Sequence, residues 1–433
     1  MKFSFFCFLV FGLYSFVVYR HDDVPHSQTL YMPGQEKDTS GENSFLEELM
    51  KKYPQYFDFI LQHRDSLKVQ IIYTQINRDI HNNPSFKNYY FNVNPDKYFY
   101  PASSVKLPVA LLALQKLNEL RLAGLNKSSS FVTEKAYSGQ TVVLNDPTTP
   151  DGRPSVGQYV KKIFLVSDND AFNRLYEFLG QEYINDRLHK MGYTDARIVH
   201  RLEISLSEDE NRHSNPVNFY NGSGKLLYRQ PMQFNQHPYM ISNDSIGKGY
   251  YKGGQFIDRA MDFSRKNRIS LEDLHNILRS IIFPASVPVK QRFNLREEDY
   301  NFVYRYMSQY PSETKYPSYD TVNYWDAFGK LLYWGSEKGN LPRNIRIFNK
   351  EGDAYGFLTD INYFVDFDRH IEFMLSATIY CNQDEILNDD KYDYDSLGLP
   401  FMKQLGRVIY DYETKRKRAH IPGLMKFRLK YDK

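Results

Sequence analysis

Cysteine is almost absent from this chain of 433 residues, which contains only Cys7 and Cys381. If the apolar N-terminal run that holds Cys7 is removed, no intramolecular disulfide can form. Stability must then come from a hydrophobic core, which a chain of this length can build. Cys381 follows the apolar run 373–380, a position typical of a buried thiol at the end of a strand.

A large excess of charge of one sign is also missing. Lys and Arg number 55 against 52 for Asp and Glu, which gives a formal net charge of +3. This imbalance is too small to indicate nucleic acid as a partner. The sequence has no Gly-x-Ser-x-Gly, His-Glu-x-x-His, Walker or Cys-x-x-Cys motif, and we expect no metal and no cofactor. Apolar residues make up 42% of the chain, which fits a packed globular core.

The long apolar run at the N-terminus has the pattern of an export signal. Lys2 precedes apolar residues 3–18, and polar residues 19–23 follow. The run is marginally short for a membrane span, and no small-x-small cleavage site follows it. Residues 1–21 are therefore expected to be a signal peptide or an uncleaved N-terminal anchor. We expect an exported protein of the periplasm or cell envelope, and membrane association through this segment stays open.

The rest of the chain divides by composition. Residues 22–43 are polar, with Pro and Gly, and are expected to form a linker. Residues 44–413 carry periodic apolar patterns and are expected to form one domain. The basic tail, 414–433, is expected to be solvated or to contact an acidic envelope surface. The sequence does not indicate an oligomeric state.

Apolar periodicity predicts both helices and strands within the domain. Helices are expected over 44–62, 103–122, 156–166, 170–179, 271–282, 297–309, 324–337 and 397–412. Strands are expected over 68–76, 88–93, 357–366 and 371–380. Strands near both ends of a chain can pair in one sheet. We therefore predict an α/β fold, in which helices flank an antiparallel sheet and a helical subdomain is inserted over about 104–340.

Ser103 and Lys106 open the long apolar helix expected over 103–122. Residues three apart share a helix face, so a partly desolvated Lys106 could act as the base for a Ser103 nucleophile. The same spacing occurs at Ser245–Lys248 and Ser312–Lys315, but in polar segments rich in Gly and Pro. On its own, the pair is more readily explained as a capping serine and a solvated lysine.

Two further triplets carry polar groups at the ends of apolar runs. Ser167-Asp168-Asn169 joins two expected helices, where it could cap a helix or pass a proton through Ser167 and hold a carbonyl with Asn169. Lys350-Glu351-Gly352 precedes the strand at 357–366 and could place a cation beside the nucleophile. Its glycine would let a substrate approach the backbone closely.

The order Ser-x-x-Lys, Ser-Asp-Asn and Lys-x-Gly resembles the serine β-lactamase and penicillin-binding protein superfamily, and class A β-lactamases most closely. Residues 132–135, 165–175, 191–192 and 201–203 add to this resemblance, which extends over about 44–413. Extra sequence lies at about 212–267 and 310–340. The resemblance implies an acyl-enzyme on Ser103, with catalytic roles for Lys106, Ser167 and Lys350.

The resemblance also assigns residues that contact the substrate. Asn169 would orient it, and Gly352 would lie beside it. The backbone N–H groups of Ser103 and Asp353 would bind the oxyanion. A small molecule or a peptide is the expected substrate, with a β-lactam as the leading specific hypothesis.

The chain departs from the family pattern at two places. The family carries a water-positioning Glu in the loop after 201–203, and an ungapped alignment places Leu206 there. Glu203, Glu208 and Glu210 are nearby substitutes that do not match cleanly, so slow deacylation is expected.

The second departure is Glu351, which replaces the usual Thr or Ser of the third triplet. Together with Asp353 it would disfavour substrates that carry a carboxylate. A binding or sensor module of the same fold that has lost turnover is the main alternative. A hydrolase of cell-wall peptides or of simple esters also stays open.

Overall fold

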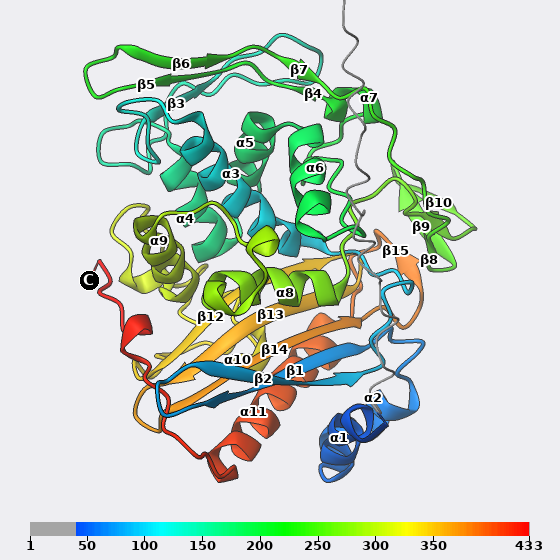
Figure 1. Ribbon diagram of the computed structural model, residues 1–433. Coiled ribbons are helices and arrows are strands. Elements are labelled where there is room, and N and C mark those ends of the chain that lie inside the picture. Colours follow the sequence, from blue (N-terminus) through cyan, green and yellow to red (C-terminus); the bar gives the residue numbers. More distant parts are fainter. Residues whose placement is uncertain (1–39, 433) are drawn as a thin grey trace, which may run out of the picture. The chain divides into compact units, whose positions relative to one another are not determined.

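A five-stranded antiparallel sheet forms the centre of the domain (Figure 1). Its strand order is β12-β13-β14-β1-β2, so strands from both ends of the chain lie side by side. The strands are β1 (Gln70–Arg78), β2 (Pro84–Phe91), β12 (Ile345–Ala354), β13 (Phe357–Asp366) and β14 (Ile371–Tyr380). Strand β1 pairs with β14, the last strand of this sheet along the chain, with Ile71 opposite Ala377. The predicted α/β class and antiparallel sheet are therefore confirmed.

The computed structural model describes residues 40–432, with side chains from residue 44 onward. The expected signal or anchor at 1–21, with Cys7, lies outside the described residues. Helix α1 begins at Ser40, so the linker expected over 22–43 ends earlier than predicted. Within residues 40–432, no helix is long and apolar enough to cross a membrane.

Both faces of the sheet are covered, because alternate side chains of a strand point to opposite faces. Ile71 and Tyr73 of β1 pack into one apolar cluster and Ile72 into another. The first cluster lies under α1 (Ser40–Lys51), α2 (Pro54–Gln62) and α11 (Leu399–Lys415). The helix expected over 44–62 is divided between α1 and α2, and Pro54 opens the second of them.

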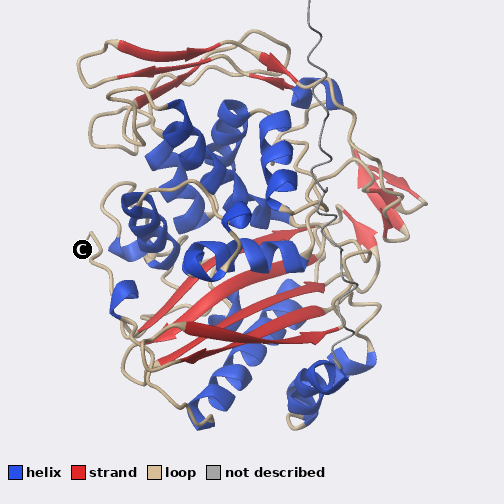
Figure 2. Cartoon of the chain, in the orientation of Figure 1, coloured by secondary structure: helices blue, strands red, loops and turns tan. Residues whose placement is uncertain are grey.

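The other face packs against the inserted helices (Figure 2). These are α3 (Lys106–Leu120), α4 (Val156–Val166), α5 (Asn169–Leu179), α6 (Gln181–Met191), α8 (Leu271–Ile282) and α9 (Glu297–Ser308). Helix α3 is buried on nearly every side, as its apolar sequence predicts. Helix α6 was not predicted, although Ile184, Leu188 and Met191 are buried at helical spacing.

Short strands accompany this helical subdomain. They are β3 (Ser130–Thr133), β4 (His213–Ser214), β5 (Val217–Tyr220), β6 (Leu226–Gln230), β7 (Gln233–Phe234), β8 (Ser245–Ile246), β9 (Gly249–Lys252), β10 (Gln255–Ile257), β11 (Met261–Asp262) and β15 (Ile386–Leu387). Most of them lie in the extra sequence at 212–267, after the single-turn helix α7 (Glu208–Arg212). The insertion is thus a helical core with peripheral hairpins.

The helix predicted over 324–337 is wrong. Only α10 (Leu331–Trp334) is helical there, and Tyr333 has a positive φ of 87°. The backbone of Tyr333 lies against Gly406 of α11, where a Cβ would be only 2.2 Å from the Tyr333 nitrogen. The Tyr333 ring then packs on Phe364 and Tyr410. This tertiary contact overrides the helical pattern of the segment.

The C-terminal tail packs on the domain, which corrects the expectation of a solvated tail. Phe427 is buried, and its ring lies 4.9 Å from the ring of Tyr363. Arg416 and Arg418 form ion pairs with the buried carboxylate of Glu413. The basic run at the start of the tail is therefore partly neutralised by the domain itself.

Candidate active site

A short 3-10 turn, Ala102–Val105, carries the predicted nucleophile into the start of α3. Ser103 is partly exposed and lines a cleft of about 590 Å³, whereas Ser104 is buried. The Ser104 hydroxyl donates a hydrogen bond of 2.6 Å to the carbonyl of Pro101. Of the two adjacent serines, only Ser103 therefore presents its hydroxyl to a ligand. Ala102 has a φ of 45°, a strained conformation for a residue with a side chain.

Lys106 lies one helical turn after Ser103, fully buried at the start of α3. Its Nζ donates hydrogen bonds to the Ser167 carbonyl at 2.5 Å, to Ser167 Oγ at 3.2 Å and to Asn169 Oδ1 at 2.5 Å. Lys106 and Ser167 are 61 residues apart in the sequence, so these bonds bring the Ser-x-x-Lys and Ser-Asp-Asn motifs together.

Ser167 connects the two predicted lysines. Its hydroxyl is 3.2 Å from Lys106 Nζ and accepts a hydrogen bond of 2.8 Å from Lys350 Nζ. Ser167 ends α4 in the left-handed conformation, with a φ of 58°. Asp168, the residue between Ser167 and Asn169, caps α5 by accepting a bond from the Ala171 N–H. The capping interpretation therefore holds for Asp168, while Ser167 and Asn169 face the lysines.

The surroundings of Lys106 make its neutral form accessible near neutral pH. Burial, reinforced by the ammonium of Lys350, lowers the pKa of Lys106 to about 7. Near neutral pH a large share of the molecules then carries an unprotonated amine at this position. Such an amine can accept a proton from a serine hydroxyl, which an ordinary lysine cannot do at this pH.

Gly352 brings the edge strand β12 against the nucleophile turn. A Cβ at this position would lie 2.6 Å from the Pro101 carbonyl and 2.9 Å from the Ser103 nitrogen. The contact between strand and turn therefore requires a glycine here, and the expected place of Gly352 beside the substrate stays a prediction. The contact also places the Ser103 backbone close to the segment that leads to Asp353, where two N–H groups could receive an oxyanion.

The two added carboxylates have different surroundings. Glu351 is buried and forms an ion pair of 2.8 Å with Lys350. Burial would raise the pKa of Glu351, but the ammonium of Lys350 outweighs it and the pKa is lowered. Glu351 does not line the cleft, so it is not the cleft carboxylate that the sequence led us to expect.

Asp353 does line the cleft, where its side chain still reaches solvent. Surrounding protein, reinforced by the carboxylate of Glu351, raises its pKa to about 6. It is therefore mostly ionised at neutral pH and adds negative charge to the cleft.

The three candidate carboxylates, all in the segment that follows α6, lie in different surroundings. Glu203 lines the cleft and accepts a hydrogen bond of 2.5 Å from the Asn169 amide. Leu206 does not line this cleft. Glu208 forms an ion pair with Arg265, and Glu210 caps α7 through Ser207. Of the three candidate carboxylates, Glu203 alone lines the cleft.

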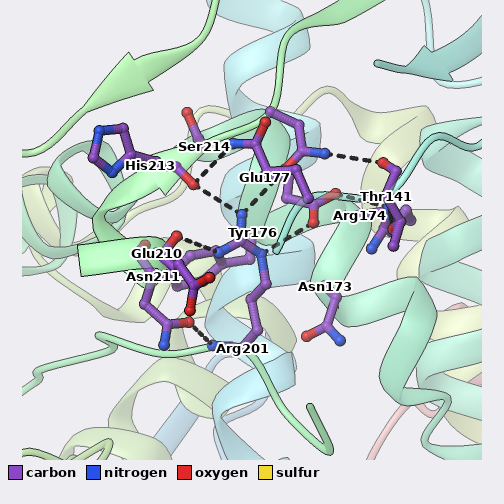
Figure 3. A network of polar contacts seen from close by, with 12 residues as sticks. Thr141, Asn173, Arg174, Tyr176, Glu177, Arg201, Glu210, Asn211, His213 and Ser214 are labelled. Atoms are coloured by element: carbon purple, nitrogen blue, oxygen red, sulfur yellow. Dashed lines mark hydrogen bonds and ion pairs between the residues drawn. The ribbon is translucent and has the colours of Figure 1, made fainter. Parts of the chain in front are cut away.

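A buried polar network holds this loop in place (Figure 3). Arg201 Nε donates to Glu177 at 3.0 Å, and its guanidinium also reaches the carbonyls of Glu210 and His213. Asn173 exchanges two hydrogen bonds with the backbone of Leu202, at 2.9 and 3.0 Å. These contacts fix both ends of the segment and so position Glu203 beside Asn169.

Several cleft residues were missed by sequence reasoning. Tyr100, His200, Lys266 and Tyr355 line the cleft together with Ser103. Burial lowers the pKa of His200 to about 4, so its imidazole is neutral. None of these residues lies in a short motif, and only the fold brings them together.

The two other Ser-x-x-Lys pairs are surface features, in which Lys248 pairs with Glu385 and Ser312 donates to Asp326. Within residues 44–432, no cluster of His, Cys, Asp and Glu could hold a metal ion.

Comparison with known proteins places this chain in a family. The model of the beta-lactamase enzyme family (Beta-lactamase2) matches residues 60–412. No curated protein matches the chain. Among solved structures, a β-lactamase from Xanthomonas campestris pv. campestris is 12% identical, covers 84% of this chain and 97% of its own, and has a TM-score of 0.45.

A class A β-lactamase from Clostridium kluyveri is 14% identical, with 83% and 98% coverage and a TM-score of 0.45. PBP-A is 13% identical, with 83% and 97% coverage and a TM-score of 0.45. The family match spans most of the chain and includes all three motifs. The chain belongs to the beta-lactamase enzyme family.

Proposed function

We propose that the protein is a serine hydrolase that cleaves an amide or ester through an acyl-enzyme on Ser103. The observation that carries this proposal is the Ser167 hydroxyl, which lies within hydrogen-bond distance of both Lys106 and Lys350. Family membership supports the same class of chemistry. A β-lactam is the leading specific substrate, and a cell-wall peptide or a simple ester is the alternative.

In the acylation step, neutral Lys106 takes the proton of Ser103 as its oxygen attacks the carbonyl carbon. The N–H groups of Ser103 and Asp353 stabilise the negative oxygen of the tetrahedral intermediate. Ser167 passes its proton to the leaving group as the bond to that group breaks. Lys106 then gives Ser167 the proton that it took from Ser103, across 3.2 Å. Lys350 contributes positive potential, and Asn169 holds the substrate.

In the deacylation step, Glu203 takes a proton from a water molecule, which attacks the acyl carbonyl, and the proton returns to the Ser103 oxygen as that oxygen leaves. The exposed Glu203 carboxylate beside Asn169 supports this role. It also favours turnover over the alternative of a sensor module that stays acylated. We therefore expect deacylation to be faster than the sequence alone led us to predict.

A side-by-side assay of a chromogenic β-lactam and a neutral ester tests this proposal. We expect wild type to release more than one equivalent of product per enzyme from at least one of them, and Ser103→Ala to release none. A stoichiometric burst without turnover would favour the sensor module. If neither compound is turned over and neither acylates the protein, the proposal is contradicted.

We also propose that the protein acts in the cell envelope, which the apolar run at residues 3–18 supports. Fractionation of cells that produce the full chain tests this proposal. Recovery of the protein from the cytosol alone would contradict it.

A further inference from the structure

A second hollow adjoins the catalytic cleft. This groove of about 520 Å³ lies between the loop that carries Glu203 and the inserted segment 238–266. Its size is within the range of ligand sites in proteins. The inserted segment belongs to the extra sequence of this chain, so one wall of the groove comes from the insertion.

The groove and the cleft share residues along their common border. Both are lined by His200, Ile204, Ser205 and Lys266. A ligand whose reactive bond lies at Ser103 can therefore continue across Ile204 and Ser205 into the groove. Lys266 stands at this junction, with its Nζ 5.6 Å from the centre of the Tyr355 ring.

The charge of the groove differs from that of the cleft. Among residues 44–432, Arg197, Arg212 and Lys266 form no ion pair, although all three line the groove. The other two cations of the lining, Arg201 and Arg265, pair with Glu177 and Glu208. The lining thus carries five cations against two carboxylates, Glu208 and Asp262, and is positive overall.

The cleft beside Ser103 is acidic by comparison. Glu203, Asp353 and Asp390 line it, and Lys266 lies at its border with the groove. Like charges repel, so a carboxylate close to the scissile bond is disfavoured. A carboxylate farther along the ligand, near Lys266, is favoured. The two hollows together select a ligand with a neutral reactive bond and a remote negative charge.

The remaining lining fits a peptide-like chain. Two buried nitrogen atoms of the lining, Arg197 Nε and His200 Nε2, have no hydrogen-bond partner among the described residues. Both atoms are shielded from solvent, so contact with a ligand would come from the exposed side chains of the lining. Ile204, Met240 and Ile241 are 44%, 89% and 55% exposed along the groove and offer apolar contact.

We propose that the groove is an extended subsite for the remote part of a peptide-like substrate, and that Lys266 binds a carboxylate of that substrate. This inference rests on the proposed function, since it assumes that the reactive bond lies at Ser103. It assigns the substrate class as an elongated acidic peptide derivative rather than a compact molecule.

Two synthetic peptide esters test the inference. They share a neutral scissile ester and differ only at one remote residue, which is Glu in one and Gln in the other. We expect wild type to prefer the Glu ester in kcat/KM by about tenfold, the value of a charge-assisted hydrogen bond. Lys266→Met should abolish this preference, and Lys266→Arg should retain most of it. Lys252→Met, on β9 of the same insertion but outside both hollows, is the matched control.

The outcomes separate the inference from the proposed function. Equal kcat/KM for the two esters in wild type, or an unchanged preference in Lys266→Met, would overturn the inference while ester cleavage by Ser103 still stands. If Ser103→Ala cleaves the esters as fast as wild type, the proposed function itself fails. If Lys252→Met also loses the preference for the Glu ester, that preference comes from the overall positive charge of the protein rather than from Lys266. This result would also overturn the inference.

Discussion

The carboxylate of Glu203 accepts a hydrogen bond of 2.5 Å from the side-chain amide of Asn169, across 34 residues of chain. This contact places an acid-base group beside the residue proposed to hold the substrate. It is made possible by the network that ties Arg201 to Glu177 beneath the loop. The proposed deacylation step would therefore depend on a loop whose position is fixed by buried charges.

Replacing Glu203 by Gln should trap the acyl-enzyme. The amide cannot accept a proton from water, so we expect deacylation to slow by about 10²- to 10⁴-fold, with acylation less affected. Intact-mass spectrometry after mixing with substrate would detect the trapped adduct. Asp209→Asn, an exposed position of α7 outside the cleft, is the matched control. Unchanged deacylation in Glu203→Gln would assign water activation to another group.

The acylation rate should rise with pH through about 7. Lys106 accepts a proton only when it is neutral, and burial together with Lys350 lowers its pKa to about 7. Below this pH the amine is protonated and acylation slows; above it the rate reaches a plateau. Stopped-flow acylation at a series of pH values measures the profile.

Lys350→Met provides a check on the origin of this profile. Removing the ammonium removes a repulsion that disfavours protonated Lys106. The midpoint should therefore move to higher pH, in addition to any loss of rate. A midpoint that moves to lower pH would contradict this electrostatic account.

Gly352→Ala should damage both stability and the site. The added methyl would meet the Pro101 carbonyl at 2.6 Å, and neither backbone can move freely. We expect a loss of about 1–3 kcal/mol in the free energy of unfolding, typical of overpacking. Urea denaturation measures it. Gly222→Ala, where no atom lies within 4 Å of the new methyl, is the control and should be nearly neutral.

The C-terminal tail should contribute to stability. Phe427 is buried against the rings of Tyr304, Phe348 and Tyr363. Phe427→Ala should cost about 3–5 kcal/mol in the free energy of unfolding. Ile421→Ala, at a side chain that is 71% exposed, should change it by less than about 0.5 kcal/mol. Equal effects of the two substitutions would show that the tail does not pack as described.

Much of the scaffold could be predicted from local pattern. Strands 357–366 and 371–380 and helix 271–282 have the bounds expected from their apolar runs. Their periodicity is strong because they are buried in the core. The segment 324–337 failed because the contact between Tyr333 and Gly406 is set by tertiary structure, which local periodicity does not encode.

The candidate site also has a part that the sequence predicts and a part that only the tertiary structure determines. Ser103, Lys106, Ser167 and Lys350 stand in short motifs, and their order along the chain indicated one site. The direction of a loop side chain does not follow from such motifs. An ungapped alignment assigned Leu206 to the position of the family's carboxylate. The loop instead turns at Glu203, which has a φ of 59°, and Asn173 and Arg201 hold the loop in this conformation. We expected Glu351 to face the cleft, because the sequence does not show that its side chain forms a buried ion pair with Lys350 instead.

The central claim, that Ser103 is the nucleophile, is tested most directly by covalent labelling with a serine-hydrolase acylating probe and peptide mapping of the adduct. Wild type and Ser104→Ala should both carry one adduct on residue 103, because the Ser104 hydroxyl is occupied by Pro101 and does not face the cleft. Ser103→Ala should carry none. Labelling of Ser103→Ala at the wild-type rate, or an adduct mapped to Ser104 or Ser167, would contradict the account.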